Sequence, residues 1–135
     1  ISIFEEMAAF GEKLRPSVGL HSYTNKVCRI MGRCELLVTK PGALTCTEAI
    51  VMNKPMVLVN TLPGQERANA AFLSGLGCAE WVKRGELAET VRYILANPEK
   101  RKQMENACGT SHVESAGEVV KILYDMVEKM DKKNI

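Results

Sequence analysis

The sequence predicts an α/β domain: a parallel sheet with flanking helices, followed by a helical tail. Short apolar runs alternate with helical patterns, as in layered domains with right-handed crossovers. The runs over residues 36–39 and 56–59 are continuous rather than alternating, which is typical of strands covered on both faces. Each of these two runs is followed by a turn that contains Pro and Gly and then by good helix formers.

The elements are predicted in chain order from apolar spacing and from stop signals. Apolar residues near helical spacing indicate a first helix over 2–14, which Pro16 ends. A short strand over 18–23 and a helix over 25–33 follow, with Val27, Ile30 and Met31 facing inward. Strands are then predicted over 36–39, 56–59 and 79–82, and helices over 44–52, 66–74, 86–96, 98–107 and 117–129.

Local residues support these boundaries. Asn53 to Pro55 ends the helix over 44–52, and Gly75 or Gly77 closes the helix over 66–74. Pro98 suits a first helical position. Trp81, in a short strand, is expected in the core.

Composition narrows the class of protein. The 135 residues suffice for one domain, with 46% hydrophobic and 25% charged residues, and the net charge of +2 does not favour nucleic acid or a membrane surface as a partner. The five cysteines form no CxxC pair and are expected to be reduced thiols of a cytosolic protein. No apolar stretch approaches the ~20 residues of a membrane span. The chain starts with Ile inside a helical pattern, so we expect a piece of a longer protein.

The most informative segment is Leu36 to Glu48, which reads LLVTKPGALTCTE. It has the order strand, glycine turn, helix, in which Gly42 allows a sharp turn and the close approach of a ligand. The N–H groups of Ala43, Leu44 and Thr45 would then point at one place, which suits an anion and above all a phosphate. A plain strand-to-helix turn is the alternative. The spacings GxxxxGK[ST] and GxGxxG do not occur, which argues against an ATPase or a nicotinamide enzyme.

Glu48 has two interpretations. Thr45-Cys46-Thr47-Glu48 fits the capping box, in which the glutamate accepts a hydrogen bond from a backbone N–H at the helix start. Alternatively, Glu48 faces the crevice and accepts hydrogen bonds from two sugar hydroxyls.

A second polar turn, Pro63-Gly64-Gln65-Glu66, follows the next apolar run. Gln65 and Glu66 offer a donor and acceptors that suit a polyhydroxylated ligand. They could equally be ordinary residues of a helix start, where acidic side chains are favoured. Asn69, four residues after Gln65, is predicted to brace this loop.

At these residues the chain resembles a known family. The segments VTKPGALTCTEAI and NKPMVLVNTLPGQERANAAFL are similar to the C-terminal half of the glycolipid glycosyltransferases, namely the processive diacylglycerol glucosyltransferases and the monogalactosyldiacylglycerol synthases. These are related to the peptidoglycan lipid-linked N-acetylglucosaminyltransferase. The resemblance runs from about Val18 to Val82. It implies the C-terminal domain of a GT-B fold, here a partial Rossmann-like sheet, with no metal.

The resemblance also implies a role for each candidate residue. Tyr23 and Thr24 would lie against the uracil base, and Gly42 to Thr45 would hold the diphosphate of a UDP-sugar. Glu48 would bind the ribose hydroxyls, and Gln65 and Glu66 the transferred hexose. The glycolipid enzymes more often have a second Gly where this chain has Ala43.

The function expected from the resemblance is transfer of a hexose from UDP to a diacylglycerol-type lipid. The catalytic base and the lipid-acceptor surface would lie in a missing N-terminal domain, so no catalytic residue is expected here. The whole protein would be cytoplasmic and peripheral at the membrane, and the truncated sheet could make this chain self-associate. Two alternatives remain: a non-catalytic module that docks a partner glycosyltransferase domain, and half of a sugar-nucleotide epimerase.

Overall fold

The structure is a computed structural model that describes residues 19, 21, 23–59, 61–111 and 115–131. The described residues belong to two compact units divided after Arg33. The helix expected over 2–14 lies outside the described residues.

The first unit contains helix α2, Val27–Arg33, close to its predicted bounds. Met31 is buried as expected, but Val27 and Ile30 are exposed, so the prediction that both face inward is wrong. Their positions flank Met31 on a helix of only seven residues, which is too short for a wide apolar face. Of the strand expected over 18–23, Gly19, His21 and Tyr23 are described, and none of the three belongs to a strand.

The second unit is built on a parallel sheet of three strands in the order β1-β2-β3. They are β1 (Leu37–Thr39), β2 (Met56–Leu58) and β3 (Ala79–Trp81). The central strand β2 is buried along its whole length, which explains its continuous apolar sequence. The register pairs Thr39 with Leu58 and Leu58 with Trp81, so the three strands end in line at one edge.

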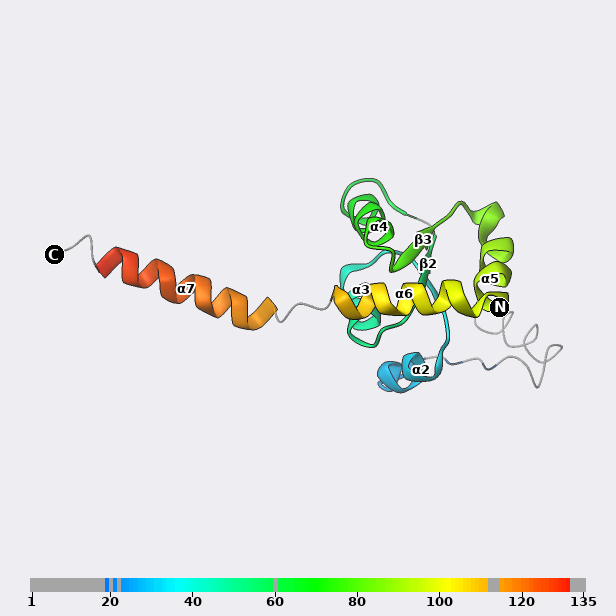
Figure 1. The fold of residues 1–135 in the computed structure, drawn as a ribbon, viewed down its shortest axis with the longest axis horizontal. Helices are drawn as coiled ribbons and strands as arrows, with labels where there is room; N and C mark the ends of the chain where they lie inside the picture. Colours follow the sequence, from blue (N-terminus) through cyan, green and yellow to red (C-terminus); the bar gives the residue numbers. More distant parts are fainter. Residues whose placement is uncertain (1–18, 20, 22, 60, 112–114, 132–135) are drawn as a thin grey trace. The chain divides into compact units, whose positions relative to one another are not determined.

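Helices connect and cover these strands. They are α3 (Ala43–Val51), α4 (Gln65–Gly75), α5 (Leu87–Ala96), α6 (Pro98–Thr110) and α7 (Ser115–Asp131), with a 3-10 turn, η1 (Arg84–Glu86), before α5. In Figure 1, β2 and β3 lie between α4 and α5, and α6 runs across the end opposite the turns; α4 packs on β3, and α6 on α3 and α5. The predicted α/β layering and each predicted helix of this unit are confirmed.

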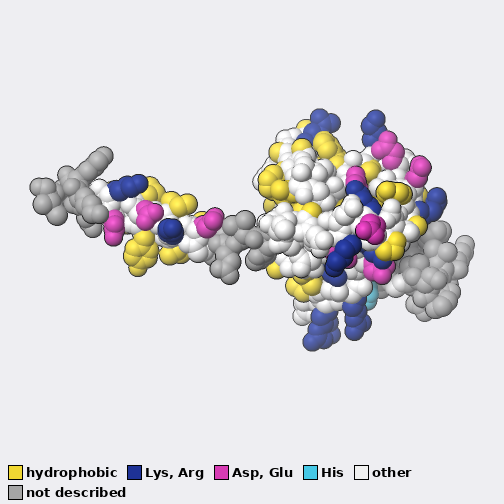
Figure 2. Space-filling model, viewed as in Figure 1, with side chains coloured by type: hydrophobic (Ala, Val, Ile, Leu, Met, Phe, Trp, Pro, Cys, Tyr) yellow, Lys and Arg dark blue, Asp and Glu magenta, His cyan; other side chains and the backbone are white. Residues whose placement is uncertain are grey.

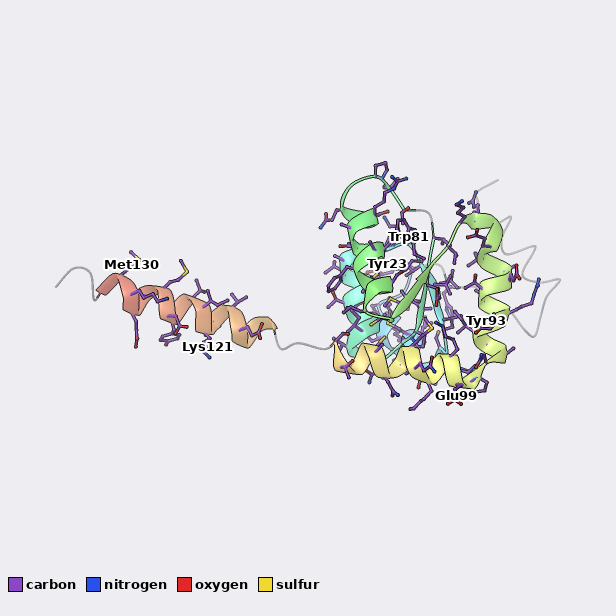
Figure 3. The ribbon with its side chains drawn as sticks, turned by 45° about the horizontal axis from the view of Figure 1, so that its top comes forward. Tyr23, Trp81, Tyr93, Glu99, Lys121 and Met130 are labelled. Atoms are coloured by element: carbon purple, nitrogen blue, oxygen red, sulfur yellow. The ribbon has the colours of Figure 1, made fainter. Side chains whose placement is uncertain are left out.

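The core of the second unit centres on Val57, Ile94 and Met104, from β2, α5 and α6. Trp81 does not join them. Its side chain is 43% exposed at the end of β3 (Figure 3), so the expectation that it is a core residue is wrong. Position 81 is the last of a three-residue edge strand, where only part of the ring can be covered.

None of the five cysteines forms a disulfide in the structure, and the reduced state of the thiols stays a prediction. Cys78 and Cys108 are fully buried, and the Sγ of Cys108 lies 3.5 Å from the carbonyl oxygen of Lys54. Burial, and then the neighbouring Cys78, raise the pKa of the Cys108 thiol from its ordinary value of 9.0 to about 12. A protonated Cys108 is therefore part of the folded state.

This buried thiol predicts a loss of stability in alkali. Above pH 9 the unfolded chain releases the Cys108 proton while the folded chain keeps it, so the free energy of unfolding falls with rising pH. We expect a loss of about 1 kcal/mol between pH 9 and pH 10. Urea unfolding at both pH values measures it. The Cys108→Ala variant should show a shallower decline, and an equal decline in the variant would contradict the assignment.

Within the part of the chain that the structure describes, β1 pairs with β2 alone. The outer edge of β1 therefore has no partner strand among the described residues, and an unpaired strand edge can pair with another chain. The expected self-association of the chain stays a prediction. The described helices include none that is both long and apolar enough to cross a membrane.

Candidate functional site

The candidate site lies at the edge of the sheet where all three strands end. The turn after β1 leads into α3, and the turn after β2 leads into α4. Because the strands are parallel and in register, both turns emerge at the same edge, which is the position where open α/β sheets bind ligands. In Figure 1 the connection into α4 loops out at this edge.

The first turn leaves the start of α3 open. Gly42 is the N-cap residue, and no side chain caps the start of the helix with a hydrogen bond. The first backbone bond of the helix runs from the N–H of Cys46 to the carbonyl of Gly42, at 3.0 Å. The N–H groups of Ala43, Leu44 and Thr45 precede that bond, so no helical carbonyl accepts from them. Three backbone donors and the positive end of α3 are thus available to a ligand.

This geometry excludes one of the two interpretations of Glu48, the capping box. Thr45 is the third residue of α3 rather than its N-cap, and Glu48 lies three residues further into the helix. The capping box is therefore wrong. Among the described residues the exposed Glu48 side chain has no hydrogen-bond partner. It follows Leu44 and Thr45 by four and three residues, so it shares their face of α3.

The role of Gly42 also needs correction. Its φ of −73° and ψ of 134° are angles that any residue adopts, so a sharp turn does not require glycine here. An added Cβ would meet no atom within 4 Å. What glycine provides at position 42 is open space beside the free N–H groups.

The second turn is built differently. Gly64 has a φ of 92° and a ψ of −127°, a conformation that side chains with L chirality rarely adopt, and Gln65 begins α4 directly after it. One carboxylate oxygen of Glu66 accepts from the backbone N–H of Leu62 at 2.9 Å, and the other lies 3.1 Å from the Nζ of Lys40. These bonds, the first from Leu62 and the second from Lys40, lower the pKa of Glu66.

Asn69 connects the two turns. Its side-chain amide donates a hydrogen bond to the carbonyl oxygen of the buried Pro41, 3.0 Å away. The sequence predicts that Asn69 braces its own loop; the structure shows that it holds the other turn instead. Together with the Lys40–Glu66 pair, this bond ties the start of α3 to the start of α4.

Two hollows lie near the turns. One of about 150 Å³ lies between α3 and α4 and is lined by Ala43, Cys46, Thr47, Ile50, Asn69, Phe72 and Leu73. The other, of about 520 Å³, lies at the ends of β2 and β3 and includes Thr61, Arg67, Trp81 and Lys83 in its lining. On the visible face of the molecule, basic and acidic side chains are interspersed over this unit (Figure 2).

The structure thus brings Gly42 to Thr45, Glu48, Gln65, Glu66 and Asn69 together within the second unit. Tyr23 and Thr24 belong to the first unit. Tyr23 is 92% exposed, and the Thr24 hydroxyl accepts from the N–H of Lys26 at 3.0 Å. No group of three potential metal-ligand side chains occurs in the described ranges.

Sequence reasoning missed Lys40. Its position before a Pro-Gly turn gives no signal of a partner, because Glu66 is 26 residues away and on another turn. Only the parallel register places the two residues side by side.

Comparison with known proteins gives consistent matches. Residues 2–120 match the family model described as glycosyltransferase family 28 C-terminal domain. The processive diacylglycerol beta-glucosyltransferase of Bacillus licheniformis is 33% identical over 110 residues, which cover 81% of this chain and 28% of that protein. Monogalactosyldiacylglycerol synthase 1 of Arabidopsis thaliana is 30% identical over 120 residues, which cover 87% of this chain and 22% of that protein. The chain therefore spans under a third of the length of these relatives.

Solved structures agree on the fold. MurG of Acinetobacter baumannii superposes with a TM-score of 0.65 at 19% identity, over 79% of this chain and 33% of that one. The glycotransferase of kitacinnamycin superposes with a TM-score of 0.54 at 16% identity, over 80% and 34%. The expectation of a Rossmann-like C-terminal domain of the GT-B type is confirmed.

Proposed function

The chain belongs to the family of glycosyltransferase family 28 C-terminal domains, and from this premise we propose that it is the UDP-sugar-binding part of a hexosyltransferase. The observation that carries the proposal is the open N-terminus of α3, beside a second polar turn at the same edge of the sheet. An uncapped helix start with three available N–H groups is a ready anion site.

The diphosphate of the donor would bind at Ala43, Leu44 and Thr45. Transfer of the hexose leaves UDP, whose terminal phosphate gains negative charge as the bond to the sugar breaks. Backbone N–H groups and the dipole of α3 are fixed before the reaction, so they can stabilise that charge without reorganising. In this proposal the backbone N–H groups and the helix dipole, rather than a metal ion, stabilise the charge on the leaving phosphate.

The side chains would read the rest of the donor. Glu48 is exposed on the same face of α3 as Leu44 and Thr45, and its carboxylate would accept from both ribose hydroxyls. Gln65 and Glu66, at the start of α4, would bind the hexose. Tyr23 and Thr24 would hold the uracil base, an assignment that rests on the family resemblance.

The acceptor and the catalytic base are proposed to come from an N-terminal domain outside this chain. One relative is named a diacylglycerol glucosyltransferase and another a monogalactosyldiacylglycerol synthase, and we infer a diacylglycerol-type lipid as the acceptor. The whole enzyme would then work peripherally at the cytoplasmic membrane surface. This chain would bind the donor but not turn it over, because attack needs an oriented acceptor and a base.

The Ala43→Pro variant tests the anion site directly. Proline is well tolerated at the first residue of a helix, and Gly42 has the extended conformation that a following proline prefers. The variant therefore removes one N–H donor and keeps the helix. We expect calorimetry to show UDP affinity reduced by roughly fivefold to tenfold with an unchanged melting temperature.

The Ala43→Ser variant is the matched control, since it keeps the N–H and should bind UDP as the parent chain does. Failure of the parent chain to bind UDP would refute the proposed function and favour a module that only docks a partner domain. Product analysis of the full-length enzyme with UDP-glucose separates hexose transfer from epimerisation.

A further inference from the structure

We propose that Lys40 is a positioning residue. It holds the Glu66 carboxylate in the orientation that accepts hydrogen bonds from the hexose hydroxyls. This inference rests on the proposed function, because it assigns the sugar-binding geometry to a contact between the two turns. Lys40 itself touches no sugar in this proposal.

The two side chains of the Lys40–Glu66 ion pair differ in their exposure to solvent. The Lys40 side chain is 64% exposed, whereas that of Glu66 is 16% exposed. An ion pair with so exposed a cation is screened by solvent and adds little to the free energy of unfolding. The main effect of the Lys40–Glu66 pair is therefore on the orientation of the Glu66 side chain rather than on the stability of the fold.

The hydrogen bonds of Glu66 fix its side chain and leave part of the acceptor capacity of the carboxylate unused. Leu62 N–H binds one carboxylate oxygen and Lys40 Nζ binds the other, at 2.9 and 3.1 Å. Each carboxylate oxygen can accept two hydrogen bonds, so one acceptor position remains on each. Two donors thus hold the carboxylate from opposite turns while two acceptor positions stay available for sugar hydroxyls.

The same geometry couples the two halves of the donor site. Lys40 directly precedes Pro41, whose carbonyl accepts from Asn69 of α4. The Lys40 bond to Glu66 and the Asn69 bond to Pro41 both run between the turn before α3 and the first two turns of α4. A ligand that orders the first turn would therefore also order the carboxylate on the second.

The test compares UDP and UDP-glucose binding by calorimetry on the parent chain and on Lys40→Met and Lys40→Arg. We expect Lys40→Met to weaken UDP-glucose about threefold to tenfold more than it weakens UDP. The ratio of the two affinities cancels any charge effect that Lys40 has on the shared diphosphate. Lys40→Arg keeps a donor at this place and should restore most of the ratio.

A double variant makes the test strict. If Lys40 acts through Glu66, then adding Lys40→Met to Glu66→Ala should not lower the ratio of UDP-glucose affinity to UDP affinity any further. Lys102→Met is the matched control, because it removes another exposed lysine paired with a glutamate, Glu105, on α6. It should leave both affinities unchanged.

The outcomes separate the two proposals. Absence of UDP binding by the parent chain would refute the proposed function. Normal binding of both ligands, a loss of UDP-glucose affinity in Glu66→Ala and an unchanged ratio in Lys40→Met would overturn the inference about Lys40 alone. Equal losses for UDP and UDP-glucose in Lys40→Met would place Lys40 at the diphosphate instead.

Discussion

The Glu48→Gln variant should bind UDP and UDP-sugar much more weakly while it folds as well as the parent chain. The substitution keeps the shape of the side chain and removes the charge that would accept two ribose hydroxyl bonds. Loss of hydrogen bonds to a charged group costs roughly 1.5–3 kcal/mol, which is about tenfold to a hundredfold in affinity. Both ligands contain the ribose, so both should lose affinity to the same degree.

Folding should not respond, because Glu48 caps nothing: α3 begins at Ala43 and Gly42 is its N-cap. Calorimetry and a thermal melt together measure the two effects. Glu89→Gln is the matched control, since Glu89 is an exposed glutamate in the first turn of α5. A large drop in melting temperature with unchanged UDP affinity would return Glu48 to a structural role.

Gln65→Ala and Glu66→Ala, in contrast, should distinguish between the two ligands. They should weaken UDP-hexose about tenfold or more and leave UDP affinity nearly intact, because UDP lacks the sugar that these side chains would contact. In the full-length enzyme part of the loss should appear in kcat, since a displaced anomeric carbon is misaligned for attack.

Glu66 also accepts from Leu62 N–H, so its removal frees the loop before α4. Glu66→Gln is therefore the necessary companion variant: it keeps an acceptor for Leu62 and loses the charge. Equal losses for UDP and UDP-hexose would place Gln65 and Glu66 at the nucleotide. No loss for either ligand would make them ordinary residues of a helix start.

Much of the second unit could be predicted from the sequence because its signals are local. Continuous apolar runs gave β1 and β2, and the Pro and Gly residues gave the limits of α3 and α4 within one or two residues. Pro98 does stand at the start of α6, with Asn97 as its N-cap. These features depend on few neighbours, and tertiary contacts do not override them.

The errors have physical causes of two kinds. The capping box is wrong for a local reason: α3 begins at Ala43, two residues before Thr45, and its N-cap Gly42 has no side chain that could accept a hydrogen bond. Asn69 and Lys40 bind residues 28 and 26 positions away, across two strands of a sheet. Spacing in the sequence carries no information on such contacts, which the parallel register creates.

At Gly64 the second turn has a backbone conformation that favours one chirality of amino acid. Its pair of backbone angles is the mirror image of an ordinary extended residue, so a D-amino acid would adopt it without strain whereas an L-residue would not. An L-alanine Cβ would meet no atom within 4 Å there, so lack of space is not the obstacle. A chemically synthesised segment with D-alanine at position 64 would therefore keep the loop before α4, and L-alanine at the same position would not.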